Sequence, residues 1–141
     1  MLRAILVTLL LLIAPAASPG GPVSDADQAE FQRIISGQID AFRADDGPRA
    51  YSYAAPNIHQ IFPTPDIFMQ MVKQGYKPVY RPQSFNFGAA GDDPLGRPSQ
   101  RVTLVGPDGK TYEALYSMER QPDGTWRIQG CTLLEGPGLD A

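Results

Sequence analysis

The sequence has little of what disulfide frameworks, metal sites and catalytic centres require. Its 141 residues include one cysteine, Cys131, and one histidine, His59. A single cysteine forms no internal disulfide, so packing must stabilise the fold. One histidine, without a second or a cysteine pair at ligand spacing, does not indicate a transition-metal site. The composition therefore predicts neither a metal nor a cofactor.

Clustered basic residues and a second long apolar run are lacking too. The net charge is −3, and lysines and arginines form no run anywhere in the chain. Nucleic-acid-binding domains gather such residues on one face, so the sequence predicts no nucleic-acid partner. A membrane-spanning helix needs about 20 apolar residues, and no stretch beyond the N-terminal segment approaches that length. We expect no membrane association once that segment is removed.

The N-terminal segment has the pattern of a secretory signal peptide. Arg3 gives a positive start, residues 4–13 are all apolar except for Thr8, and Ala14 and Ala16 supply the small residues of a cleavage site. The alternative is an uncleaved membrane anchor, but the run reaches Pro15 before it is long enough to span a bilayer. No cysteine follows the run to carry a lipid. We therefore predict a signal peptide over residues 1–17 and a periplasmic or secreted protein.

The first half of the remaining chain predicts helices. After a flexible leader at 18–23, Ser24 begins a helix as N-cap, and the sequence Asp45-Asp46-Gly47 ends it. Short helical turns are expected at 49–55 and 57–62. Thr64, followed by Pro65, begins a further helix that stops at Gly75. The phenylalanine and methionine side chains of that helix suit a ligand pocket, but their spacing favours a stripe packed in the core.

The second half changes to the two-residue period of strands. We expect strands at 79–87, bent by Pro82, and at 100–105, 110–120 and 125–134, with residues 88–98 forming a loop. Pro-Asp-Gly at 107–109 and at 122–124 predicts two hairpin turns. The prediction is a single α+β domain over 24–135, with N-terminal helices packed on a curved four-stranded antiparallel sheet. Residues 136–141 are expected to form a disordered tail.

Strand alternation assigns side chains to the two faces of the sheet. The helix-facing side of the sheet and the apolar stripes of the helices are predicted to form one core. Its members are Phe31, Ile35, Ile39, Phe42, Phe68, Met71, Val72, Tyr116, Trp126 and Ile128. Leu134 is expected on the same face as Trp126. Leu115, Cys131 and Leu133 are expected on the opposite face. An uncovered apolar sheet face predicts a homodimer through the sheet, although polar neighbours such as Glu113 would suit solvent equally.

One stretch resembles a known family. Residues 38–82 read QIDAFRADDGPRAYSYAAPNIHQIFPTPDIFMQMVKQGYKPVYRP. This sequence resembles the DUF4864 family of small exported bacterial proteins of unknown function, and the resemblance extends to Gly130. The order of helices before a curved meander also resembles the NTF2-like, cystatin-like cone. That resemblance implies either an enzyme, such as an isomerase, dehydratase or hydrolase, or a binding or dimerisation module, because one fold hosts many functions.

Few residues are candidates for chemistry. His59 is a candidate general base because histidine is the side chain most often used to exchange protons near neutral pH, although a surface or capping role suits its position between two prolines. Cys131 is either a nucleophile or a small buried hydrophobe on a strand, and the second interpretation is favoured because no activating partner is near in sequence. No calcium loop, nucleophile elbow, phosphate loop or zinc-protease helix is present.

Aromatic residues offer a binding interpretation instead. A pocket with an aromatic wall and a few hydroxyl donors is predicted from Tyr51, Phe68, Tyr112, Tyr116 and Trp126. The alternative is that these tyrosines are ordinary strand residues with their hydroxyls at the rim. Together the sequence favours a small exported binding or interaction module, non-enzymatic, with a small apolar ligand. The alternative is an NTF2-like enzyme acting on a small apolar molecule, with His59 or a buried carboxylate as general base.

Overall fold

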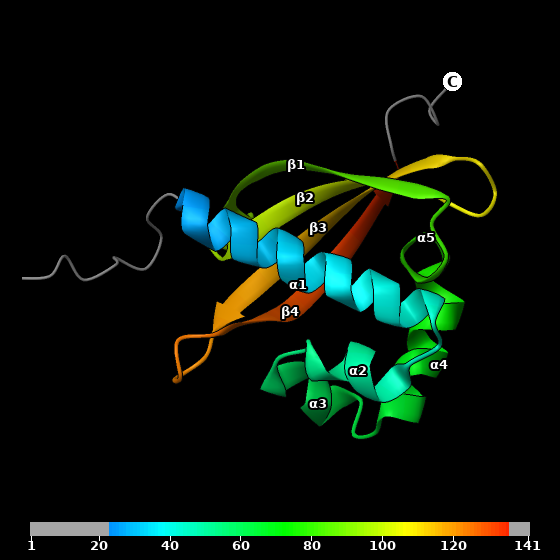
Figure 1. Cartoon of the computed structure of the whole chain (residues 1–141), viewed down its shortest axis with the longest axis horizontal. Helices are drawn as coiled ribbons and strands as arrows, with labels where there is room; N and C mark the ends of the chain where they lie inside the picture. Colours follow the sequence, from blue (N-terminus) through cyan, green and yellow to red (C-terminus); the bar gives the residue numbers. More distant parts are fainter. Residues whose placement is uncertain (1–22, 136–141) are drawn as a thin grey trace, which may run out of the picture.

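The computed structural model of the chain describes residues 23–135 (Figure 1). The predicted signal peptide at 1–17, the leader up to residue 22 and the tail at 136–141 lie outside the described residues. Within this described range, five helices precede four strands. Their bounds are α1 Asp25–Arg43, α2 Gly47–Ser52, α3 Pro56–Ile61, α4 Pro65–Gly75, α5 Lys77–Tyr80, β1 Ser84–Asp92, β2 Pro98–Val105, β3 Thr111–Arg120 and β4 Trp126–Glu135.

Helix α1 begins and ends where local chemistry dictates. The Ser24 hydroxyl accepts from the backbone N–H of Asp27, as predicted for an N-cap. At the other end the N–H of Asp46 donates to the Ala41 carbonyl and that of Asp45 to the Phe42 carbonyl. These two bonds make a Schellman motif, with Asp45 in the left-handed position at φ 52° where glycine is usual. The chain therefore leaves α1 at a fixed angle.

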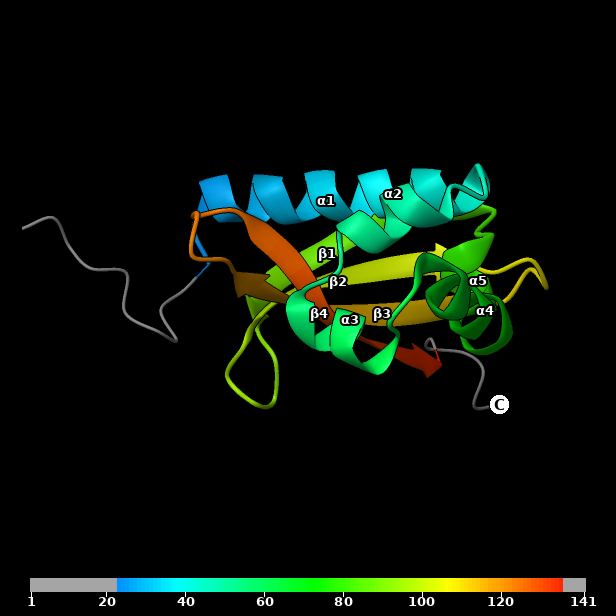
Figure 2. The same cartoon turned by 90° about the horizontal axis from the view of Figure 1, so that it is seen from below.

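The four strands form one antiparallel sheet in the order β1-β2-β3-β4. Both predicted hairpin turns are present, and their glycines, Gly109 at φ 78° and Gly124 at φ 86°, adopt the conformation that a side chain disfavours. Helix α1 lies across one face of the sheet, and α2 to α4 gather beyond its β4 edge (Figures 1 and 2). The fold is thus the predicted α+β arrangement of helices on a four-stranded antiparallel sheet, and the sheet is not closed.

The start of the sheet differs from the prediction. Lys77–Tyr80 is a helical turn, α5, and β1 begins only at Ser84. The predicted strand at 79–87 was wrong in its first half because Pro78 at the N-terminus of a turn, followed by Pro82, favours helix and then a break. β1 continues to Asp92 and takes in residues 88–92 of the predicted loop, with an irregularity between Phe87 and Ala90. The true loop is residues 93–97.

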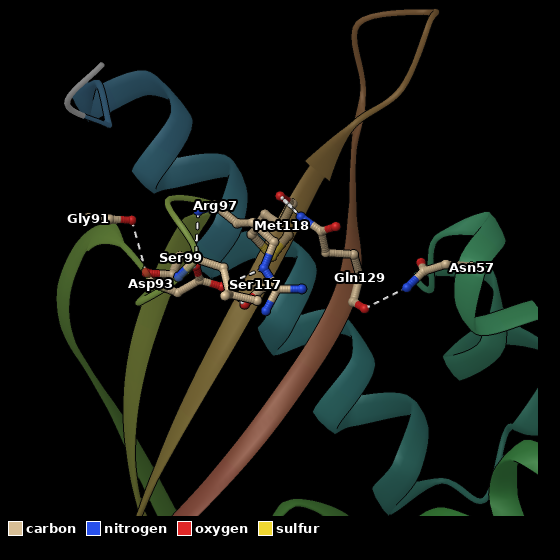
Figure 3. A network of polar contacts seen from close by, with 9 residues as sticks. Asn57, Gly91, Asp93, Arg97, Ser99, Ser117, Met118 and Gln129 are labelled. Atoms are coloured by element: carbon tan, nitrogen blue, oxygen red, sulfur yellow. Dashed lines mark hydrogen bonds and ion pairs between the residues drawn. The ribbon is translucent and has the colours of Figure 1, made fainter. Parts of the chain in front are cut away.

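A bulge in β4 changes which side chains face the helices. Ile128 pairs with Met118, but Gly130 pairs with Ser117, so Gln129 is an extra residue. The Gln129 side chain donates to the Met118 carbonyl at 2.8 Å, and its own carbonyl accepts from the Asn57 side chain (Figure 3). The bulge is therefore held by hydrogen bonds on both sides.

The face assignment beyond the bulge was consequently wrong. Cys131 pairs with Tyr116 and Leu133 with Ala114, so both lie on the helix-covered inner face. Leu134, predicted to share a face with Trp126, lies on the outer face and is 42% exposed. Leu115 is on the outer face as predicted. A one-residue insertion reverses every later side chain of a strand, and alternation alone does not reveal it.

One core lies between the inner face of the sheet and the helices. Of the ten residues predicted for it, Met71 and Trp126 are half-buried and packed against it, and the other eight are buried. Val102 and Leu104 of β2 and Met118 of β3 are fully buried there as well. Within residues 23–135 no helix is long and apolar enough to cross a membrane.

Candidate ligand pocket

The inner face of the sheet and the helices α1, α3, α4 and α5 surround a pocket of about 310 Å³. We call it the ligand pocket. Its lining comes from every helix except α2 and from the last two strands, and no charged side chain contributes to it. The lining residues are Gln38, Phe42, Ala54, Ile58, Phe62, Phe68, Met71, Val72, Tyr76, Val79, Tyr116, Ile128, Gly130 and Cys131.

One wall of the pocket is fixed by a short parallel bridge to the edge of the sheet. The Ala55 N–H donates to the Ile128 carbonyl at 2.8 Å, and the Ile128 N–H donates to the Tyr53 carbonyl at 2.9 Å. Ala54 pairs with Ile128 in the middle of this bridge. The bridge pairs the backbone N–H and carbonyl of Ile128, which lie at the sheet edge just before the bulge. It positions α3 beside the pocket, where Ile58 and the following Phe62 form one side.

A second wall is fixed by a polar clasp of Asp45, Tyr80 and Arg81. Arg81 Nη2 is 2.8 Å from Asp45 Oδ2, and the Tyr80 hydroxyl also donates to Asp45. Arg81 donates in addition to the Phe42 carbonyl, which also accepts from the Asp45 N–H at the end of α1. The clasp joins α1 to α5, which carry the lining residues Phe42 and Val79. Asp45, Tyr80 and Arg81, all within the stretch at 38–82, therefore have a structural role in shaping the pocket.

The floor of the pocket contains three weakly polar groups from Tyr76, Tyr116 and Cys131. Burial raises the pKa of the Cys131 thiol to about 12, so the thiol is not ionised at neutral pH. Burial, and then the nearby Cys131, hold the pKa of Tyr116 well above its ordinary value of 10, and the same two causes raise that of Tyr76. The Tyr76 hydroxyl donates to the Cys131 carbonyl at 3.1 Å. All three groups are neutral, and none is an activated nucleophile or base.

The five residues predicted to form an aromatic pocket do not all meet. Phe68 and Tyr116 line the ligand pocket. Tyr51 supports it, because its ring packs 5.6 Å from that of Phe68 and its hydroxyl donates to the Phe62 carbonyl at 2.6 Å. Tyr112 lines a separate hollow and donates to Asp108. Trp126 packs edge-on against Phe31 at 4.9 Å, outside the lining.

His59 does not line the ligand pocket. Its ring stacks on Tyr51 with centroids 3.8 Å apart, and its Nε2 lies 2.8 Å from the Tyr51 carbonyl. A carbonyl only accepts, so this contact fixes the proton on Nε2. The contacts of His59 hold α3 against α2.

The buried carboxylate belongs to Asp93 (Figure 3), whose side chain is 2% exposed and does not line the ligand pocket. It accepts from the backbone of Leu95 and Arg97, from Arg97 Nε at 2.6 Å and from the Ser117 hydroxyl at 2.7 Å. Burial opposes its charge, but these hydrogen bonds outweigh burial and lower its pKa to about 2. We call Asp93, Arg97 and Ser117 the Asp93 cluster. It closes the β1–β2 loop over the outer face.

Most of the lining was missed by sequence reasoning. The signal that pointed to it was the stripe of α4, since Phe68, Met71 and Val72 all line the pocket. Cys131 and Tyr76 had no such signal, because the bulge and the unforeseen α5 turn place them. Among the side chains of the described range, no group of three or more His, Cys, Asp or Glu gathers to hold a metal ion.

These observations define a small α+β domain with one apolar pocket beside its sheet. The model of the DUF4864 family, described as a domain of unknown function, matches residues 24–141. The chain belongs to this family. No curated protein and no solved structure matches it, so the likeness to the NTF2-like cone stays a prediction.

Proposed function

We propose that the protein is an exported, non-enzymatic module that binds a small uncharged apolar molecule in the ligand pocket. The observation that carries this proposal is a pocket of about 310 Å³ whose lining has no charged side chain. Small-molecule sites are concave, mostly apolar and about 300–1,000 Å³ in volume. The pocket is at the lower end of that range, which favours a compact ligand. Export rests on the N-terminal pattern of residues 1–17.

Native mass spectrometry of protein isolated from the periplasm of an expressing bacterium tests both parts. We expect a mature chain that begins near Ala17, together with a population carrying one bound small molecule. Met71→Trp should empty that population because it fills the pocket from α4. Gln70→Trp is the matched control, since Gln70 is exposed on the same helix and outside the lining. Recovery of an intact N-terminus from the cytoplasm would contradict export.

The enzymatic alternative has less support from the geometry. Neither His59 nor the buried carboxylate of Asp93 belongs to the lining, and the ionisable groups that do are held neutral. A general base must lie within hydrogen-bond reach of the proton it takes. If His59 were that base, His59→Ala would abolish turnover of the bound molecule and leave its binding intact.

Pairing of two copies through the outer face of the sheet is a separate proposal. With the corrected alternation, its apolar residues include Leu115, which is 9% exposed, and Leu134. Sedimentation of the mature protein at micromolar concentration tests it. A dimer that dissociates on Leu134→Glu would support the proposal, and a monomer unchanged by this substitution would remove it.

A further inference from the structure

The floor of the ligand pocket holds a hydroxyl group that the protein leaves unused. Tyr116 is 1% exposed, and its hydroxyl has no hydrogen-bond partner of ordinary geometry within residues 23–135. Buried hydroxyls are nearly always hydrogen-bonded, because one without a partner loses its bonds to water and gains nothing. An unpartnered hydroxyl in a pocket therefore needs an explanation.

The hydroxyl lies on the pocket side of the core. Tyr116 lines the pocket, and so do both ionisable groups that act on it electrostatically, Cys131 and Tyr76. The hydroxyl also meets the Cys131 thiol in a weak hydrogen bond, but neither group satisfies it fully. The Tyr76 hydroxyl already donates to the Cys131 carbonyl, and a thiol is only a weak donor and acceptor. The proton of the Tyr116 hydroxyl is thus the strongest polar contact that the pocket can offer a ligand.

The other unpartnered buried atom of the described side chains offers no such contact. It is Oε1 of Gln100, the cross-strand neighbour of Tyr116 on β2. Gln100 is fully buried but outside the pocket lining, and its amide nitrogen is engaged with the Gly88 and Arg101 carbonyls. The coincidence of a lining position and an unused donor is specific to Tyr116.

We propose that the ligand is a neutral molecule with a carbonyl or ether oxygen at one end of an apolar body, and that the Tyr116 hydroxyl donates to this oxygen. The inference rests on the proposed function and specifies its ligand. A carboxylate is a poor candidate, because no cation lines the pocket to compensate its charge. The hydroxyl is covered in the empty pocket, so the oxygen reaches it only when neighbouring side chains such as Cys131 shift.

Two probes of nearly the same shape test this contact: acetophenone, which has a carbonyl, and α-methylstyrene, which has a methylene group in its place. Their affinities are measured by ligand-observed NMR for the wild type and for Tyr116→Phe. We expect the substitution to weaken acetophenone about tenfold and to change α-methylstyrene less than about twofold, because a hydrogen bond accounts for about that ratio. Tyr76→Phe is the control, a lining hydroxyl with a partner in the protein, and should change the acetophenone affinity less than about threefold.

The outcomes separate this inference from the proposed function. If both probes bind the wild type and Tyr116→Phe affects them equally, the hydroxyl contact is refuted and the apolar pocket stands. If neither probe binds the wild type at millimolar concentration, the binding function fails and the inference with it. Circular dichroism and thermal unfolding of each variant verify that the fold is intact, so that a loss of affinity reports on the contact.

Discussion

Tyr116 and Ser117 are neighbours on β3, yet they belong to two regions that treat buried polar groups differently. Ser117 faces outward and donates to Asp93, which receives four hydrogen bonds. Tyr116 faces inward, and among the described residues its hydroxyl meets only the Cys131 thiol, a weak hydrogen-bond acceptor. A saturated cluster holds one geometry and has no contact to offer a ligand. The Tyr116 hydroxyl in the apolar pocket can still donate to a ligand atom. We therefore place the proposed function in the pocket.

The largest expected effect concerns the reactivity of Cys131. Its pKa of about 12, against an ordinary 9.0, lowers the thiolate fraction about a thousandfold. Iodoacetamide at pH 8 should therefore alkylate the native protein about a thousandfold more slowly than the protein unfolded in urea. Cys131 is the only cysteine, so mass spectrometry of the whole chain reports its modification. A native rate within tenfold of the unfolded rate would show a thiol that is exposed or activated.

The Asp93 cluster should be costly to break. Asp93→Asn can place an amide nitrogen where a carboxylate oxygen accepted hydrogen bonds from Arg97 and Ser117. It also removes the negative charge that pairs with Arg97. We expect a loss of about 3 kcal/mol in the free energy of unfolding, measured with urea. The exposed neighbour provides the control, because Asp92→Asn should cost less than about 0.5 kcal/mol. Equal effects of the two substitutions would mean that the cluster does not hold the β1–β2 loop.

The same carboxylate makes stability depend on acid. Its pKa is lowered from 3.8 to about 2, so its contribution is complete above pH 4 and is lost as the pH falls toward 2. We expect the wild type to lose about 2 kcal/mol over this interval through Asp93. Urea unfolding at a series of pH values should show a shallower slope for Asp93→Asn. Parallel slopes would assign the acid sensitivity to other carboxylates.

The smallest effect is expected for the unused hydroxyl in the pocket. Tyr116→Phe removes a hydroxyl whose only contact is the weakly accepting Cys131 thiol, so stability should stay the same or rise by up to about 1 kcal/mol. Tyr51→Phe is the matched control, because the Tyr51 hydroxyl donates to the Phe62 carbonyl, and its loss should cost about 1 kcal/mol. Thermal and urea unfolding measure both changes. A clear destabilisation by Tyr116→Phe would mean that its hydroxyl has a partner in the empty protein.

The sequence predicted the helix caps and turns better than it predicted which side chains face the pocket and which face outward. Capping at Ser24 and the two Pro-Asp-Gly turns are local signals, and the structure confirms them. The inward turn of Cys131 depends on a bulge that Gln129 and Asn57 stabilise from distant parts of the chain. No periodicity contains that information, so the outer and inner faces were exchanged for half of β4.

For the pocket too, residues with a local sequence signal were predicted and residues placed by long-range contacts were not. Phe68 was named for it because α4 has a clear stripe, and Tyr116 because β3 alternates. Trp126 and Tyr112 were named because they are aromatic, but the ends of their strands place them elsewhere. The Asp93 cluster joins a loop to the middle of β3, and such a long-range contact is not visible in a turn-rich stretch of sequence.

The central claim is that the ligand pocket binds an apolar molecule, and titration with the neutral fluorescent dye N-phenyl-1-naphthylamine tests it most directly. We predict saturable enhancement of fluorescence at one dye per chain, weakened at least about tenfold by Met71→Trp and unchanged by Gln70→Trp. Absence of saturable binding to the wild type, or equal effects of the two tryptophan substitutions, would contradict the account.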